Sequence, residues 1–448
     1  MSRSAASPTF AEAARLWLRI GLIGFGGPAG QIALMHRLLV EERRWIGEAR
    51  FLNALNYCML LPGPEAQQLA IYIGWALHGI RGGVVAGTLF VLPGALIVLV
   101  LSAVYALYGG VPLVAALFYG IKAAVLAVVV EAVIRIGKRA LRNGWMLAIA
   151  AGAFVALFAF AVPFPVVVLA AALIGLVGGR VSPDRFATAQ HGGDGTDGAV
   201  DRALTARDAQ ARGWRRPATV IAACLVLWLS PTVLLAAALG WDATFTRIAT
   251  FFSQMGVITF GGAYAALAYV AQAAVETHGW LAPGEMLDGL GLAETTPGPL
   301  ILVLQFVGFL AAFRGPGALD PLLAGVLGAA LTTWVTFLPS FLFVLAGAPF
   351  VERLSRIRLL SAALSAITAA VVGVILNLAI WFALHVLFAR VDEVAAGPLR
   401  LHRPDVTTLD PFALALSLAA FVALLRFKIG LMPTLATAAL LGMVWKLL

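Results

Sequence analysis

Two copies of a Pro-Gly-Pro tripeptide are the residues of this sequence that most clearly favour ligand chemistry. They are Pro62, Gly63, Pro64, Pro297, Gly298 and Pro299. Proline removes a backbone donor and stops a helix, so the next helix begins with N–H groups that have no partner. Those donors and the positive end of the helix dipole can hold an anion. The turns therefore predict an anion site, the alternative being kinks that serve only packing.

Polar and glycine residues near the two turns extend this predicted anion path. Two Gly-Gly pairs are expected to break further helices, Gln68 could bond substrate or a neighbouring helix, and Thr296 could bond an oxyanion or its own backbone. The added residues are Gly26, Gly27, Gly261, Gly262, Gln68 and Thr296. Gln305 and Asn377 are expected to bond between helices.

Lys122 is a lysine in the middle of an apolar segment, where its insertion costs about 2.5–3.5 kcal/mol. One interpretation is a cation that faces the anion path. The other is a structural lysine that snorkels or pairs with Glu131 or Glu65. Lys122 is included in the predicted anion path, and both interpretations stay open.

Two carboxylates are candidates for proton coupling. Glu65 follows Pro64 directly, where it either caps the next helix or carries a proton, because an ionised carboxylate would repel an anion. Glu294 precedes the second turn by three residues and is the other candidate proton carrier. Asp288 is expected to be solvated.

The composition is that of a polytopic membrane protein. Hydrophobic residues make up 61% of the chain and charged residues 12%, against about 25% charged in soluble proteins. The net charge of +9 fits basic cytoplasmic loops better than a nucleic-acid groove. Cys58 and Cys224 lie in apolar segments, which argues against disulfides and a thiolate metal site. No nucleotide-binding, metallopeptidase or hydrolase motif is present, so we expect no catalytic residues, metal or cofactor.

The chain repeats itself. A shift of 235 aligns residues 22–64 with 257–299 without a gap, and a shift of 246 aligns Leu92-Pro93 with Leu338-Pro339. Equivalent loops differ in charge: the loop 36–50 is basic, whereas its counterpart 271–285 has no Lys or Arg. Basic loops stay in the cytoplasm, so equivalent loops are expected on opposite faces. The fold class is therefore an all-α polytopic membrane protein of two homologous halves in inverted topology, with broken or re-entrant helices.

The expected organisation is an N-terminal half at 1–180, a cytoplasmic linker at 181–217, an inverting transmembrane helix at 218–244 and a C-terminal half at 245–448. Helices are expected in pairs of equivalent segments, of which the first two in each half are broken. The segments are 20–35, 51–78, 84–108, 112–136, 145–161 and 164–179, then 218–239, then 248–272, 286–313, 320–347, 359–389, 411–425 and 430–447.

The paired motifs resemble the chromate ion transporter family. The resemblance rests on Phe25-Gly26-Gly27-Pro28, the basic loop ending in Trp45, Leu61-Pro62-Gly63-Pro64-Glu65 and their second copies, and covers roughly residues 10–180 and 245–448. The length and two-half plan are similar to those of its long, bidomain members. The second copy departs from the first, because Ala263 replaces Pro28 and Leu300 replaces Glu65.

The resemblance implies export of chromate across the bacterial inner membrane, driven by an ion gradient, with protons as the expected coupling ion, and hence chromate resistance. Sulfate has a similar shape and charge and is expected to compete. The partners are then a small inorganic anion and the lipid bilayer, with a homodimer left open. The alternatives are a transporter or channel for sulfate or another anion, and a membrane-embedded enzyme acting on a phosphorylated or lipid-linked substrate.

Overall fold

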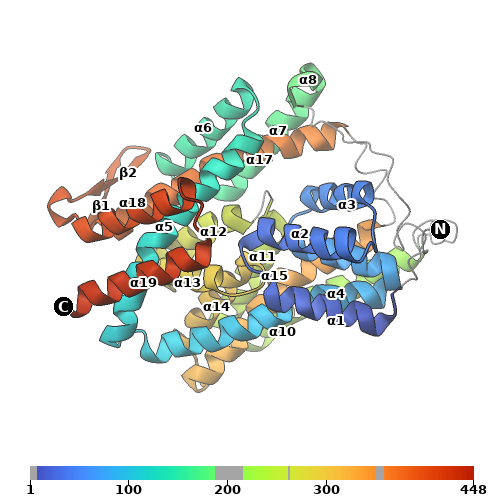
Figure 1. The fold of residues 1–448 in the computed structure, drawn as a ribbon, viewed down its shortest axis with the longest axis horizontal. Coiled ribbons are helices and arrows are strands. Elements are labelled where there is room, and N and C mark those ends of the chain that lie inside the picture. The colour runs from blue at the N-terminus through green and yellow to red at the C-terminus, as the bar shows by residue number, and fades with distance from the viewer. Residues whose placement is uncertain (1–7, 187–214, 261–262, 349–357) are drawn as a thin grey trace. The chain divides into compact units, whose positions relative to one another are not determined.

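The computed structural model describes residues 8–186, 215–260, 263–348 and 358–448, and nearly all of them are helical (Figure 1). Six of the described helices are long and apolar enough to cross a membrane. The predicted all-α fold of broken and long apolar helices is confirmed. Two of the predicted anion-path residues, Gly261 and Gly262, lie outside the described residues, as does 187–214 of the expected linker.

The first half begins with a helix that its own sequence caps. Thr9 donates from its backbone N to Glu12 Oε2 at 2.8 Å, and Glu12 N donates to Thr9 Oγ1 at 3.3 Å. This capping box starts α1 ten residues before the predicted segment. The helices are α1 (Phe10–Ile23), α2 (Gly27–His36), α3 (Glu48–Leu60), α4 (Glu65–Tyr108), α5 (Pro112–Ala140), α6 (Gly144–Phe158), α7 (Phe164–Val181) and α8 (Pro183–Phe186), with a π-helical segment at Arg37–Glu42.

The second half repeats this order after the single helix α10 (Arg215–Leu239). Asp320 caps α15 by accepting bonds from Leu322 N and Leu323 N. The elements are α11 (Thr244–Ile258), α12 (Ala263–Gln272), a π-helical segment (Ala273–Thr277), α13 (Pro283–Thr295), the 3-10 turn η3 (Leu300–Leu302), α14 (Val303–Arg314), α15 (Pro321–Gly347), α17 (Arg358–Leu387), a 3-10 turn (Val406–Thr408), α18 (Pro411–Leu425) and α19 (Leu431–Leu447).

A short β-hairpin between α17 and α18 was not among the predicted elements. Strands β1 (Val391–Ala396) and β2 (Leu399–Pro404) pair antiparallel around Gly397, whose φ is +61°. The Gly397-Pro398 dipeptide between two short alternating runs was the sequence signal for it. The hairpin adds two strands to a fold that is otherwise helical.

The helices group into two compact units, each of which draws on both halves of the sequence. Unit 1 comprises residues 1–100, 189–263 and 296–357, and unit 2 comprises 101–188, 264–295 and 358–448. In unit 1, α15 packs against α10, α11 and α14. In unit 2, α5 packs against α18 and α19, whereas its repeat equivalent α17 packs against α6 and α7 (Figure 1). Each long helix of unit 2 thus covers the hairpin of the other half.

Close helix contacts inside unit 1 repeat with the sequence. A Cβ built on Gly21 would lie 3.2 Å from Pro93 Cγ, and one built on Gly256 would lie 2.8 Å from Pro339 Cγ. In the sequence repeat, Gly256 is equivalent to Gly21 at a shift of 235 residues, and Pro339 is equivalent to Pro93 at a shift of 246 residues. The repeat found in the sequence is therefore a repeat of packing as well.

The helix pair before and after the first Pro-Gly-Pro turn folds back on itself. The rings of Tyr57 on α3 and Tyr72 on α4 lie 6.1 Å apart, on either side of the turn. α4 consists of two helices joined by a reversal at His78 and Gly79, whose backbone is not helical and where φ of Gly79 is +68°. Gly74 faces Gly82 beyond the reversal. With 13 residues, α3 is about 20 Å long, too short for a hydrocarbon core about 30 Å thick.

The second half contains a short helix, α14, that is equivalent to the segment of α4 before its reversal at His78 and Gly79. α14 has 12 residues and runs back along α15, with Gly308 against Thr332 and Ala312 against Gly328. Glycines at these contacts let the two backbones approach closely, as in other membrane helix pairs. Both halves therefore pair a short half-helix with a long helix.

Candidate functional site

The two Pro-Gly-Pro turns lie where one helix ends and the next begins, as predicted. α3 and α4 flank Gly63, and α13 and η3 flank Gly298. The φ angles of these glycines are +117° and +105°. Because L side chains rarely adopt such angles, glycine is required at the centre of each turn.

Each turn is tied to the opposite half of the chain by a backbone hydrogen bond within unit 1. Gly63 N donates to Thr259 O at 2.8 Å, and Gly298 N donates to Gly24 O at 3.0 Å. Thr259 and Gly24 are the C-terminal caps of α11 and α1, so their carbonyls are among those that a helix end leaves without an intrahelical donor. The four residues are related by the same shift of 235. The two bonds are therefore equivalent and form a pseudo-symmetric pair.

These bonds change which donors a bound anion could use. The glycine N–H of each turn already has a carbonyl partner, and Gln68 N and Leu302 N donate to Pro64 O and Pro299 O at 3.0 and 2.9 Å. An anion beside the turns must therefore depend on first-turn N–H groups and on side-chain donors.

The side chains predicted near the turns are buried in unit 1. Gln68 is fully buried, and its Nε2 donates to Pro62 O at 2.6 Å. Thr296 is 5% exposed. Gly26 and Gly27, with φ of +86° and +64°, separate α1 from α2, so the first Gly-Gly pair breaks a helix as predicted. Gln305 bonds between helices, donating from Nε2 to Ala95 O at 2.8 Å.

Lys122 pairs with a residue that the sequence placed in solvent. Its Nζ lies 3.2 Å from Asp288 Oδ2, and Tyr105 donates from its hydroxyl to the same oxygen at 2.7 Å. The predicted solvation of Asp288 is wrong, because its side chain is only 4% exposed. The ion-pair partner of Lys122 is thus Asp288 and not the predicted Glu131 or Glu65. Glu131 instead lies 3.3 Å from Arg135. All three members of the Lys122 cluster belong to unit 2.

The two proton-coupling candidates occupy different surroundings. Glu294 is 4% exposed in unit 2 and accepts a hydrogen bond from the Tyr264 hydroxyl at 2.6 Å. Glu65 is the first residue of α4 in unit 1 and is partly buried. Glu65 therefore lies in the first turn of a helix, as the sequence predicted.

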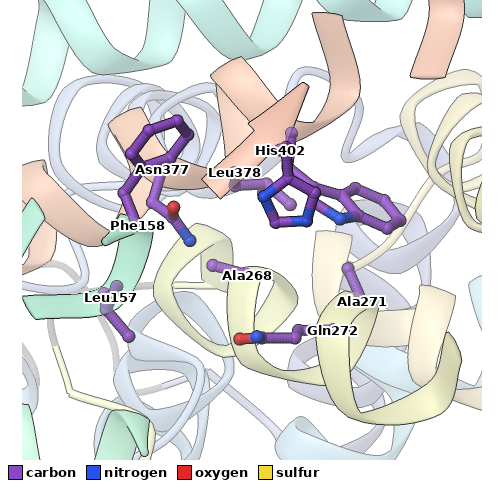
Figure 2. Close-up of a pocket in the computed structure, with 9 residues that line it drawn as sticks. Leu157, Phe158, Ala268, Ala271, Gln272, Asn377, Leu378 and His402 are labelled. Carbon is purple, nitrogen blue, oxygen red and sulfur yellow. The ribbon is translucent and has the colours of Figure 1, made fainter. Parts of the chain in front are cut away.

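A small pocket inside unit 2 holds none of the predicted site residues. Gln272, Asn377 and His402 supply its polar lining from α12, α17 and β2 (Figure 2). Among the described residues, no group of three His, Cys, Asp or Glu side chains could hold a metal ion. The candidate anion site is the pair of turns in unit 1. Unit 2 by itself contains two buried carboxylates with tyrosine partners, Asp288 and Glu294.

Comparison with known proteins decides the family. The chromate transporter profile matches residues 11–176 and 246–443. The chain belongs to the chromate transporter family. It is 35% identical over 364 residues to the chromate transport protein of Pseudomonas aeruginosa, which covers 80% of this chain and 77% of that protein.

Two further relatives extend the same match. The chromate transport protein of Cupriavidus metallidurans is 28% identical, covering 82% of this chain and 81% of the relative. The probable chromate transport protein of Synechococcus elongatus is 28% identical, covering 80% and 81%. No solved structure matches significantly. The chain is thus a multi-pass membrane protein of a transporter family, not of an enzyme family.

Several residues that contact the two turns or the buried carboxylates were not identified from the sequence. Tyr105 and Tyr264 reach their carboxylates from distant segments, and Ser340 lies beside Gly63 although it is far away in sequence. Thr259 contributes through its backbone carbonyl, which no side-chain pattern marks. The repeat was the one available signal, because it aligns Thr259 with Gly24.

Proposed function

We propose that this chain exports chromate from the cytoplasm across the bacterial inner membrane by secondary active transport, and so confers chromate resistance. The observation that carries the proposal is the 35% identity to a chromate transport protein over most of both chains. The buried Pro-Gly-Pro turns support it, because paired helix breaks in the two halves of a transporter are typical of a substrate site.

The two halves lie in inverted orientation across the membrane in this proposal. Opposite charge bias of equivalent loops supports that orientation, and so do the equivalent backbone hydrogen bonds that Gly63 and Gly298 donate. Alternating access then opens the substrate site to one side of the membrane at a time.

Protons are the coupling ion in this proposal. Glu294 is buried and accepts a hydrogen bond from the Tyr264 hydroxyl, and Glu65 begins the half-helix that follows the first turn. A carboxylate close to a bound dianion is favoured in its protonated form. Binding of chromate and of a proton would therefore support each other.

Uptake of labelled chromate into inside-out membrane vesicles tests the proposal, with and without a proton gradient and with excess sulfate. Gradient-dependent accumulation supports coupled export, and competition by sulfate measures how selective the site is. A folded and inserted protein that accumulates no chromate contradicts the proposed substrate. Gradient-independent conduction favours a channel.

A further inference from the structure

The two Pro-Gly-Pro turns have equivalent backbones but different side-chain surroundings. Around the first turn the residues are Gln67, Gln68 and Ser340. Their repeat equivalents around the second turn are Leu302, Val303 and Gly94. Every polar side chain of the first set is thus replaced by an apolar residue or glycine in the second.

The polar set is buried and only partly hydrogen-bonded. Gln67 and Gln68 are fully buried and Ser340 is 1% exposed. Within the part of the chain that the structure describes, both polar atoms of the Gln67 amide, Gln68 Oε1 and Ser340 Oγ have no hydrogen-bond partner. Native proteins pair nearly all such groups, because burying an unpaired donor or acceptor costs free energy. Where such an atom also lies beside a helix break, as Ser340 Oγ does beside Gly63, it points to a ligand.

Two of these side chains, Ser340 and Gln68, border the first turn, and Gln67 lies in the first turn of the half-helix that begins at Glu65. A Cβ built on Gly63 would lie 2.8 Å from Ser340 Oγ and 2.9 Å from Gln68 Nε2. At the second turn, a Cβ on Gly298 would lie 3.0 Å from Leu302 Cδ1 and 3.3 Å from Gly94 Cα. The first turn faces hydrogen-bonding groups, whereas the second is packed against carbon.

We propose that the first Pro-Gly-Pro turn alone binds the substrate, a tetrahedral divalent oxyanion, through Ser340 Oγ and the Gln67 amide, and that the second turn is structural. This rests on the proposed function and assigns its substrate site. The dipole of the half-helix that begins at Glu65 favours an anion there. Gln68 is a positioning residue, because its Nε2 holds Pro62 O and thereby the turn.

The test measures binding of labelled chromate to purified full-length protein, with sulfate and phosphate as competitors. The variants are Ser340→Ala and Gln67→Leu, the second of which introduces the residue found at the equivalent second-half position. Each loses a bond to a charged ligand, so the Kd should rise about tenfold or more. Ser417→Ala is the matched control, because Ser417 is buried on α18 with an Oγ that lacks a partner among the described residues. It should bind as the wild type does.

Thermal unfolding separates a ligand role from a structural one. Removing a buried group without a partner should leave the melting temperature of the substrate-free Ser340→Ala protein unchanged or raised, while the stabilisation by chromate is lost. Wild-type affinity in both variants overturns the site while leaving the proposed function intact, and so does a lower melting temperature without ligand. A wild-type protein that neither binds nor transports chromate overturns the proposed function itself.

Discussion

The buried pair of Lys122 and Asp288 gives the sharpest energetic prediction. The carboxylate is 4% exposed and the lysine side chain 28% exposed, with 3.2 Å between Nζ and Oδ2. Breaking a buried ion pair costs about 3–5 kcal/mol, because one charge is left uncompensated. We expect Lys122→Met to lower the free energy of unfolding by about 3 kcal/mol, the lower end of that range. The carboxylate keeps its hydrogen bond from the Tyr105 hydroxyl and can take up a proton.

Removing the carboxylate instead of the lysine should destabilise the protein less. Asp288→Leu leaves an ammonium that is partly exposed, so we expect about 1–2 kcal/mol. The double variant replaces the pair by apolar side chains and should lie within about 1 kcal/mol of the wild type. The coupling free energy of the cycle is then about 3–6 kcal/mol in magnitude. Lys138→Met, in the last turn of the same helix α5, is the matched control.

The assay is reversible denaturation of the purified protein in detergent, with transport measured on the same four proteins. Additive single changes would refute the pairing of Lys122 with Asp288. Transport then distinguishes the two interpretations of the lysine. A stable double variant that transports normally has lost only a structural pair, whereas a stable double variant without transport indicates that the pair serves transport.

Three further predictions concern the turns, the coupling and the orientation. Gly63→Leu and Gly298→Leu should both abolish chromate transport in vesicles while insertion into the membrane persists, since φ there exceeds +100°; normal transport in both would contradict a role for the turns. Glu294→Gln should keep chromate binding but remove the dependence of transport on the proton gradient, and an unchanged dependence would exclude it as the proton carrier. Glu42→Cys and Thr277→Cys, at equivalent exposed positions, should react with an impermeant thiol reagent from opposite sides. Labelling from one side would refute the inversion.

The breaks in the helices could be predicted because their cause is local. Proline and glycine act on the residues beside them, so the turns at Gly63 and Gly298 and the gap between α1 and α2 were found from sequence. The long apolar helices followed from composition in the same way. The segment 411–425, for example, is predicted and observed with the same bounds.

The surroundings of the charged residues depended on distant packing. Asp288 is close to a loop in sequence, which favoured solvent, but α13 packs against α5 and buries it. Gly291 permits this approach, since a Cβ there would collide with Ile121. The partner Tyr105 comes from another helix, 183 residues away. Such contacts leave no periodic pattern in the chain.

The most direct test of the account is counterflow with purified protein reconstituted in proteoliposomes loaded with unlabelled chromate. A carrier with an alternating site exchanges external labelled chromate for internal chromate, so we predict a transient overshoot of label that Gly63→Leu abolishes. Entry of label no faster than into protein-free liposomes, or conductive entry without an overshoot, would contradict a chromate carrier.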